Sequence, residues 1–401
     1  MSKFYMKWKI KENLYPLYLA FILMFGFPFN MYYEYGIAAL WAYSIRSHNP
    51  YESHKSSSRT FMMVCGLIWT LSCMYSINME FALKYMFLYF STYFICLYTS
   101  TFSFRRMLKF LLILGGAHVF FIMVDFFNHD FVMSIASKIL SREQIEINNN
   151  LRLYSGACAG LTGQTGQAAL FVTVFMYVVA SFSSKNKIFI FLLVPAIIAL
   201  LLTQKRSFLG FGILFSLGYI LYNLKNINAW SKVIIIFSGC ISFLLMQHYI
   251  ELYFDISGIT EKIEGGSLSN RDVLWNRMLD IFSDNKLLGV GLYSTDKILG
   301  MTGHNIYIQL LCENGVLGAS VFFVMFIRSL YVTIKNRVDL DIVAFSKMIV
   351  LFVLFYGFFG NPIYEIQTLF LLFISMTILD RVKSDKANFI NCNREIVCQK
   401  E

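Results

Sequence analysis

The sequence predicts an all-α integral membrane protein, a polytopic bundle of about twelve transmembrane helices with two large loops on the outer face. Hydrophobic residues make up 57% of the 401 residues and charged residues only 14%, which leaves too little polar surface for a soluble chain of this length. Apolar runs that approach the roughly 20 residues needed to cross the hydrocarbon recur along the whole chain. The sequence does not show the alternation typical of a transmembrane barrel, which favours helices.

The apolar runs give the predicted spans in chain order. They are Leu14 to Phe27, Met31 to Ile45, Phe61 to Ile77, Phe81 to Tyr98, Met107 to Phe126, Gly166 to Phe182, Ile188 to Leu202, Phe208 to Tyr222, Val233 to Met246, Val316 to Ile334, Ile342 to Phe359 and Ile366 to Leu379. These runs divide the chain into spans one to five (1–126), a first large outer loop (127–165), spans six to nine (166–248), a second large outer loop (249–315), spans ten to twelve (316–380) and a tail (381–401). The first run lacks a small-residue cleavage site after it and is predicted to remain as a helix.

Basic residues alternate between the loops and predict which side of the membrane each loop occupies. Every second loop is rich in Lys and Arg, whereas the loops around Asn30, Asn78 and Asn361 contain neither. Because positive loops stay in the cytoplasm, both termini are predicted to be cytoplasmic and both large loops extracytoplasmic. This pattern accounts for a pI near 9.1, so membrane lipids are expected partners and nucleic acid is not.

The long outer loops favour an enzyme that works at the outer membrane surface. A secondary transporter would more often show inverted repeats and interrupted helices near the midplane, which the sequence does not display. Charges within the spans are few and mostly near an end, so an ion relay is not indicated. The eight cysteines form no CxxC pair and no cluster with metal spacing, so neither a disulfide framework nor a metal site is predicted.

The short outer loop TQKRS, Thr203 to Ser207, places Lys205 and Arg206 side by side where the other short outer loops carry no cation. Two long side chains that reach the membrane interface would explain the pair without any function. The alternative is an anion site at the end of a span, because an arginine presents a planar fork of donors suited to phosphate.

Within the second large loop, Ser269 to Gly291 predicts an amphipathic helix followed by a tight turn. Ser269 or Asn270 can cap this helix, and apolar residues recur at helical spacing after it. Arg271 falls in the first turn on the apolar side, whereas Arg277 points elsewhere and is better explained by a surface salt bridge. The first large loop ends in LRLYSGACAGLTGQTG, where Arg152 is a further outer arginine beside glycines that permit close backbone approach.

The segment GHNIYIQLLCENGVLG, Gly303 to Gly318, keeps His304, Asn305 and Glu313 beside an apolar span. On a continuous helix, nine residues at 100° each would place Glu313 opposite His304. The pair Asn314-Gly315 favours a bend, so we expect a short helix to Cys312, a break, and a span from Val316. Glu313 is then predicted to orient His304 or an arginine, or to cap the break. For His304, the alternative without function is an interfacial histidine bonded to backbone.

Taken together, these motifs resemble the O-antigen ligase and polymerase superfamily of bacterial cell-envelope enzymes. The resemblance rests on the loop with Arg152 and Gly156, the TQKR span end, the NRDVLWNRMLDIF…LLGVG segment and GHNIYIQLLCENGVLG. It covers roughly residues 152 to 318, and the pattern of His-Asn followed by Glu-x-Gly-x-x-Gly is its most specific part. The first five spans add only a general likeness.

The resemblance implies a metal-independent, inverting glycosyltransferase of the bacterial plasma (inner) membrane, with no cofactor. A glycan on undecaprenyl diphosphate would pass to a sugar hydroxyl, while arginines stabilise the charge on the departing diphosphate. Arg206 and Arg152 are the first choices for this role and Arg271 the third, with Lys205 and Asn305 as further substrate contacts. Neutral His304 would take the acceptor's proton, and Glu313 completes the predicted catalytic set.

The form of the His-Asn segment favours a polymerase of O-antigen or capsular repeat units. The alternatives are an O-antigen ligase that places the glycan on lipid A core, a flippase or exporter of the lipid-linked glycan, and an accessory role in the assembly complex. The expected partners are the undecaprenyl-diphosphate-linked oligosaccharide and the pathway's chain-length regulator and flippase. Ligases carry TQ-x-R at the same span end, so that motif does not separate the two enzymes.

Overall fold

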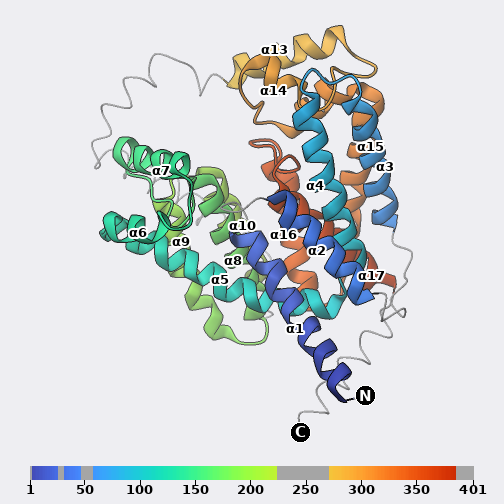
Figure 1. Cartoon of the computed structure of the whole chain (residues 1–401). Helices are drawn as coiled ribbons and strands as arrows, with labels where there is room; N and C mark the ends of the chain where they lie inside the picture. The colour runs from blue at the N-terminus through green and yellow to red at the C-terminus, as the bar shows by residue number, and fades with distance from the viewer. Residues whose placement is uncertain (1, 26–30, 47–56, 224–270, 385–401) are drawn as a thin grey trace. The chain divides into compact units, whose positions relative to one another are not determined.

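The computed structural model describes residues 2–25, 31–46, 57–223 and 271–384, and every regular element in these ranges is helical (Figure 1). The first seven helices are α1 (Ser2–Phe25), α2 (Met31–Arg46), α3 (Ser57–Cys73), α4 (Met79–Tyr98), α5 (Thr101–Phe127), α6 (His129–Ala136) and α7 (Arg142–Ser155). They are followed by α8 (Thr165–Ser183), the 3₁₀ helix η2 (Lys187–Leu192), α9 (Leu193–Leu202) and α10 (Arg206–Asn223). The last five are α13 (Arg271–Asp284), α14 (Ser294–Leu299), α15 (Ile306–Lys335), α16 (Asp341–Tyr356) and α17 (Ile366–Ser384).

The helices agree with the predicted helical membrane protein. Within the described ranges, α4, α5, α8 and α15 are long and apolar enough to cross a membrane, and shorter apolar helices cover Leu14–Phe25 and Lys187–Leu202. The other predicted spans in these ranges also coincide with helices, while Val233 to Met246, the proposed caps Ser269 and Asn270, and tail residues 385–401 lie outside them. The total of about twelve spans, the loop sidedness and the six-part division stay predictions.

The chain divides into two compact units. The first contains residues 1–19, 31–106 and 275–401, and the second contains residues 20–30 and 107–274. In the first unit, α3 packs against α4, α15 and α17, and α17 also packs against α4 and α15. Helix α2 packs on α4, and α16 packs on α15 and α17 (Figure 1). A partly buried Arg328–Asp380 ion pair joins α15 to α17 at 2.9 Å, and the Ser58 N–H of α3 donates to the same carboxylate.

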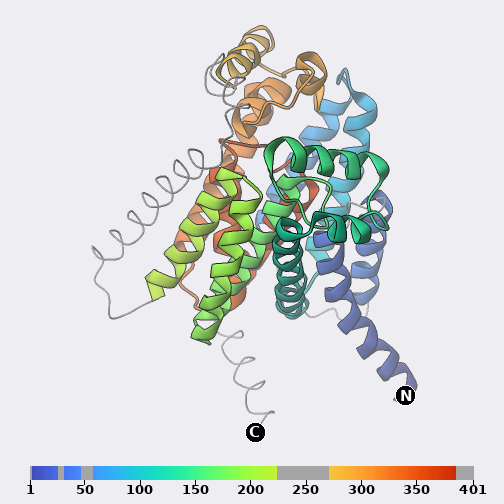
Figure 2. The same cartoon turned by 90° about the vertical axis from the view of Figure 1, so that its left-hand side faces the viewer.

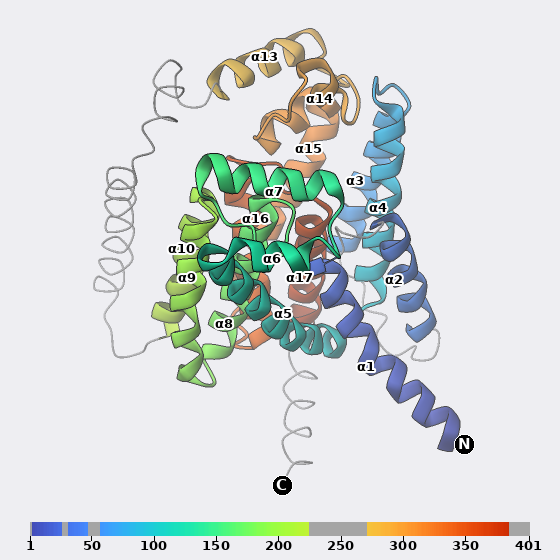
Figure 3. The same ribbon diagram turned by 60° about the vertical axis from the view of Figure 1, so that its left-hand side comes forward.

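In the second unit, α8 packs against η2, α9 and α10 (Figure 2). Its residues are buried all round the helix from Ala168 to Ser183, which is the pattern of a helix in the centre of a bundle. The helices α6 and α7 run across the direction of α8 to α10 instead of along it (Figure 3). These two helices occupy the first predicted large loop, so that segment is an ordered helical element.

Candidate functional site

The TQKR motif forms a tight turn between two helices of the second unit. Helix α9 ends at Leu202, Gln204 adopts the left-handed conformation with φ +58°, and α10 begins at Arg206. This conformation is uncommon for a residue with a side chain. As a result, Lys205 and Arg206 are exposed at the start of α10, where the unpaired N–H groups of a helix favour a bound anion.

A third cation acts on this turn. The pKa of Lys205 is lowered, first by partial desolvation and then by the positive charge of Arg271 at the start of α13. The structure therefore brings two of the predicted diphosphate contacts within electrostatic range of each other. Like charges that approach in this way destabilise each other's ionised form, and a bound anion reverses that effect.

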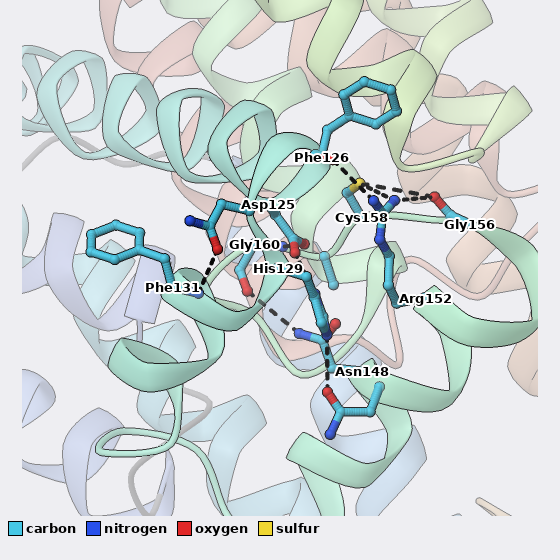
Figure 4. Close-up of polar contacts among 12 residues, drawn as sticks. Asp125, Phe126, His129, Phe131, Asn148, Arg152, Gly156, Cys158 and Gly160 are labelled. Carbon is cyan, nitrogen blue, oxygen red and sulfur yellow. Dashed lines mark hydrogen bonds and ion pairs between the residues drawn. The ribbon is translucent and has the colours of Figure 1, made fainter.

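Arg152 is held by the protein itself. Its Nη1 donates to the Gly156 carbonyl oxygen at 2.9 Å, and its Nη2 donates to the Phe126 carbonyl oxygen at 3.0 Å (Figure 4). Arg152 is half-buried in the last turn of α7, which Gly156 ends in the left-handed conformation. The fork of this arginine thus binds two backbone segments of the same unit.

In the first unit, two glycine motifs, LLGVG in residues 286–291 and ENGVLG in the segment that begins at residue 312, pair through backbone hydrogen bonds. The Val290 and Gly291 N–H groups donate to the carbonyl oxygens of Cys312 and Glu313 at 2.9 and 3.0 Å, and the Val316 N–H donates to the Lys286 carbonyl oxygen at 2.7 Å. Gly315 has φ +60° and ψ −172° and interrupts α15 there. This is the bend predicted from Asn314-Gly315. A Cβ on Gly315 would overlap the Leu287 carbonyl group and lie 2.5 Å from the Leu288 nitrogen.

His304 stands in the left-handed conformation, with φ +49°, directly before the capped start of α15. Its side chain is exposed, and its Nε2 lies 3.1 Å from the Thr302 hydroxyl oxygen. Asn305 is the N-cap, because its Oδ1 accepts from the N–H groups of Tyr307 and Ile308 at 3.1 and 3.3 Å. The backbone turn therefore presents His304 outward while its neighbour fixes the helix.

The turn that carries His304 is attached to α13. The Trp275 Nε1 donates to the Gly303 carbonyl oxygen at 3.0 Å, and a Cβ on Gly303 would lie 2.5 Å from the methyl carbon of Met278. Met278 is fully buried and Leu274 nearly so, whereas Arg277 is exposed, as predicted for the apolar and polar faces of this helix. The amphipathic helix thus packs its apolar face against the His304 turn.

Glu313 is fully buried and is the acceptor in a network that sequence reasoning missed. Its carboxylate accepts from Thr295 of α14, from Gln309 Nε2 at 3.0 Å, and from the Tyr364 hydroxyl. Gln309 also donates to Asp296 at 3.4 Å and accepts from Asn361 Nδ2 at 2.6 Å. The Glu313 side chain thus connects α15 to α14 and to the segment before α17.

The Glu313 network could be anticipated only in part. Gln309 lies one turn before Glu313 on the same helix, so its contact is a regular i,i+4 pair. Thr295 and Tyr364 come from segments about 20 and 50 residues away, and no spacing in the sequence marks them. Burial raises the pKa of the half-buried Asp296 carboxyl to about 6, against a smaller lowering by Gln309. In the described ranges, no group of three or more His, Cys, Asp or Glu residues is arranged to hold a metal ion.

A comparison with protein families bears on these motifs. Residues 191–323 match the family model Wzy_C, described as O-antigen ligase. The match confirms the resemblance to the O-antigen ligase and polymerase superfamily. The matched segment contains the TQKR turn, Arg271, His304 and Glu313, and Arg152 lies before it. No curated protein matches the chain.

Proposed function

We propose that the chain is a polymerase of O-antigen or capsular repeat units in the bacterial plasma membrane. The O-antigen ligase match supports an envelope glycan enzyme of the polymerase or ligase class that uses lipid-linked glycans. The observation that carries the proposal is the pair of exposed cations, Lys205 and Arg206, at the N-terminus of α10 inside the matched segment. A diphosphate is an anion that such a pair can stabilise.

The proposed reaction transfers the growing glycan from its undecaprenyl diphosphate to a hydroxyl of an incoming lipid-linked repeat unit. The acceptor oxygen attacks the anomeric carbon from the face opposite the diphosphate, so the carbon–oxygen bond to the leaving group breaks with inversion. Lys205, Arg206 and Arg271 stabilise the charge that develops on the departing diphosphate. No metal or cofactor takes part in the proposed steps.

His304 is the proposed general base that takes the proton of the acceptor hydroxyl. The Thr302 hydroxyl lies within hydrogen-bond distance of His304 Nε2, so this nitrogen accommodates a hydroxyl group as partner. A sugar hydroxyl that replaced Thr302 would be positioned for proton transfer. In this proposal Glu313 stabilises the His304 segment through its hydrogen bonds with Gln309, Thr295 and Tyr364. Asn305 caps α15.

The alternative is an O-antigen ligase, because the family match supports the polymerase or ligase class without separating the two enzymes. A ligase would use the same donor and the same cations but would place the finished chain on lipid A core. Deleting the gene in its host and comparing surface glycan with carrier-lipid extracts on gels separates the two enzymes. Single repeat units on the final acceptor without a ladder indicate a polymerase, whereas long chains left on the carrier indicate a ligase.

Substitutions in the restored gene test the mechanism. Arg206→Ala and His304→Ala should each abolish glycan extension while the protein stays in the membrane at normal amounts, because each removes a group used in the transition state. Arg206→Lys should support little glycan extension, since a lysine cannot reproduce a bidentate contact to diphosphate. Near-normal extension by His304→Ala would show that another group is the base.

A further inference from the structure

A polar cluster outside the family match gathers where α5 ends (Figure 4). Asp125 is fully buried, and both oxygens of its carboxylate have partners. The Oδ1 lies 2.6 Å from His129 Nδ1, and the Oδ2 accepts from the Gly160 N–H at 2.9 Å. A buried carboxylate is costly unless it is paired in this way, so this contact ties Gly160 firmly to α5.

The Gly160 loop is also held from α7. The buried Asn148 donates from its Nδ2 to the carbonyl oxygens of Gly160 and Thr162, at 3.4 and 3.0 Å. Gly160 has φ +58°, and a Cβ there would lie 3.2 Å from the Ile122 nitrogen. A side chain at this position would be strained at positive φ and would require Ile122 to shift, so glycine favours this close approach to α5. The glycine-rich loop, residues 156–163, is therefore fixed between two helices.

Arg152 adds a second attachment of the same loop to the end of α5. Its donors to Gly156 and Phe126 lie on the two terminal nitrogens of one planar group, and Nη1 also lies 3.2 Å from the sulfur of Cys158. A rigid fork that bonds two backbone carbonyls sets the separation between them. Phe126 directly follows Asp125, so both attachments reach the same point of the helix.

The loop in turn holds the TQKR turn. The Cys158 N–H donates to the Leu202 carbonyl oxygen at 2.9 Å, and Gln204 Nε2 donates to the Ser155 carbonyl oxygen at 2.5 Å. Gln204 is the left-handed residue directly before Lys205. Direct contacts thus connect Asp125 and Arg152, through the loop, to the backbone that presents Lys205 and Arg206.

We propose that Asp125 and Arg152 are positioning residues, which hold the glycine-rich loop as a support for the cations of the TQKR turn. Arg152 then acts on the diphosphate through the turn and not as a ligand. This inference rests on the proposed role of Lys205 and Arg206. A displacement of about 1 Å at a site that stabilises a transition state costs on the order of 10²-fold in rate, so the support matters even though it touches no substrate.

A double-mutant cycle between Arg152→Ala and Gln204→Ala tests the inference. The full chain is purified in lipid nanodiscs and assayed with lipid-linked oligosaccharide extracted from a host that lacks the gene. Each single variant should lower kcat by about 10- to 100-fold. The double variant should be no more than about threefold slower than the slower single variant, because both changes break the same support. Losses that multiply, or a normal rate for Arg152→Ala, overturn the inference.

Control variants separate a positioning role from general damage. Arg142→Ala removes an exposed arginine of the same helix and should leave the rate unchanged. Asp125→Asn should lower kcat, whereas Asp130→Asn, at an exposed carboxylate five residues away, should not. If Asp125→Asn fails to fold, the cycle between Arg152 and Gln204 still decides. Full activity of Arg206→Ala would refute the proposed function itself, whereas loss in Arg206→Ala with multiplying effects in the cycle refutes only the positioning role.

Discussion

Gly315→Ala tests the backbone pairing between the two glycine motifs. The backbone of Gly315, at φ +60° and ψ −172°, lies in a region reserved for glycine, where a side chain costs about 1–3 kcal/mol. The new Cβ would also overlap the Leu287 carbonyl group and force the two segments apart. That separation breaks the bonds from the Val316 and Leu317 N–H groups to Lys286 and Leu287, at about 1 kcal/mol each. The expected loss is therefore about 3–5 kcal/mol.

Gly300→Ala is the matched control. Gly300 also has a positive φ, of +71°, but nothing lies within 4 Å of the Cβ position. Its expected cost is the conformational strain alone, about 1–2 kcal/mol. Thermal unfolding of the purified chains, followed by tryptophan fluorescence at a fixed scan rate, should rank wild type first, Gly300→Ala second and Gly315→Ala last. Equal unfolding temperatures for the two variants would refute the pairing as a source of stability.

Three further predictions concern the same region. The raised pKa of Asp296, about 6, means that between pH 4 and pH 6 the folded chain binds a proton that the unfolded chain has already released. The folded state therefore loses stability as pH rises through this window. Asp296→Asn should have a higher unfolding temperature than wild type above pH 6 but not below pH 4. A difference that does not depend on pH would contradict burial as the cause of the raised pKa. Glu313→Ala removes the acceptor of the Thr295 and Tyr364 hydroxyl groups and one of the two acceptors of Gln309. It should cost about 3 kcal/mol or more, while Glu313→Gln, which keeps an acceptor oxygen, should cost less than half of that in the same unfolding assay. Arg271→Ala should lower glycan extension less than Arg206→Ala does. It should also raise the pKa of Lys205, as read from the pH dependence of lysine modification. An unchanged pH dependence would show that Arg271 and Lys205 do not interact.

The elements that the sequence predicts well are those with a strong local signal. Apolar runs predict where the helices lie, but α1 begins at Ser2 and α5 at Thr101, before the predicted starts at Leu14 and Met107, because a helix continues through polar residues that precede its apolar run. The Asn314-Gly315 pair predicts the break in α15, and the apolar spacing after Arg271 predicts α13 and its buried face. In each case, neighbouring residues contain the information.

Long-range contacts explain what the sequence leaves undetermined. The pairing of 286–291 with 312–317 uses backbone groups, so side-chain patterns do not mark it. The partners of Glu313 come from separate segments, and the carbonyl contacts of Arg152 depend on how α5 and α7 approach. One local signal was missed in the first large loop. Ser141 and Gln144 form a capping box that marks the start of α7.

Three residues with side chains adopt a left-handed backbone in the described ranges, and each stands within two residues of a helix start. They are Gln204, Tyr293 and His304. At the exposed His304 a glycine would relieve backbone strain of about 1 kcal/mol, whereas at Tyr293 it would remove a ring that packs on Tyr85 and Tyr364. A library of variants sorted only for thermal resistance should therefore enrich glycine at position 304, and the same clones should lose glycan extension. The start of α15 would thus show how far stability is sacrificed to activity.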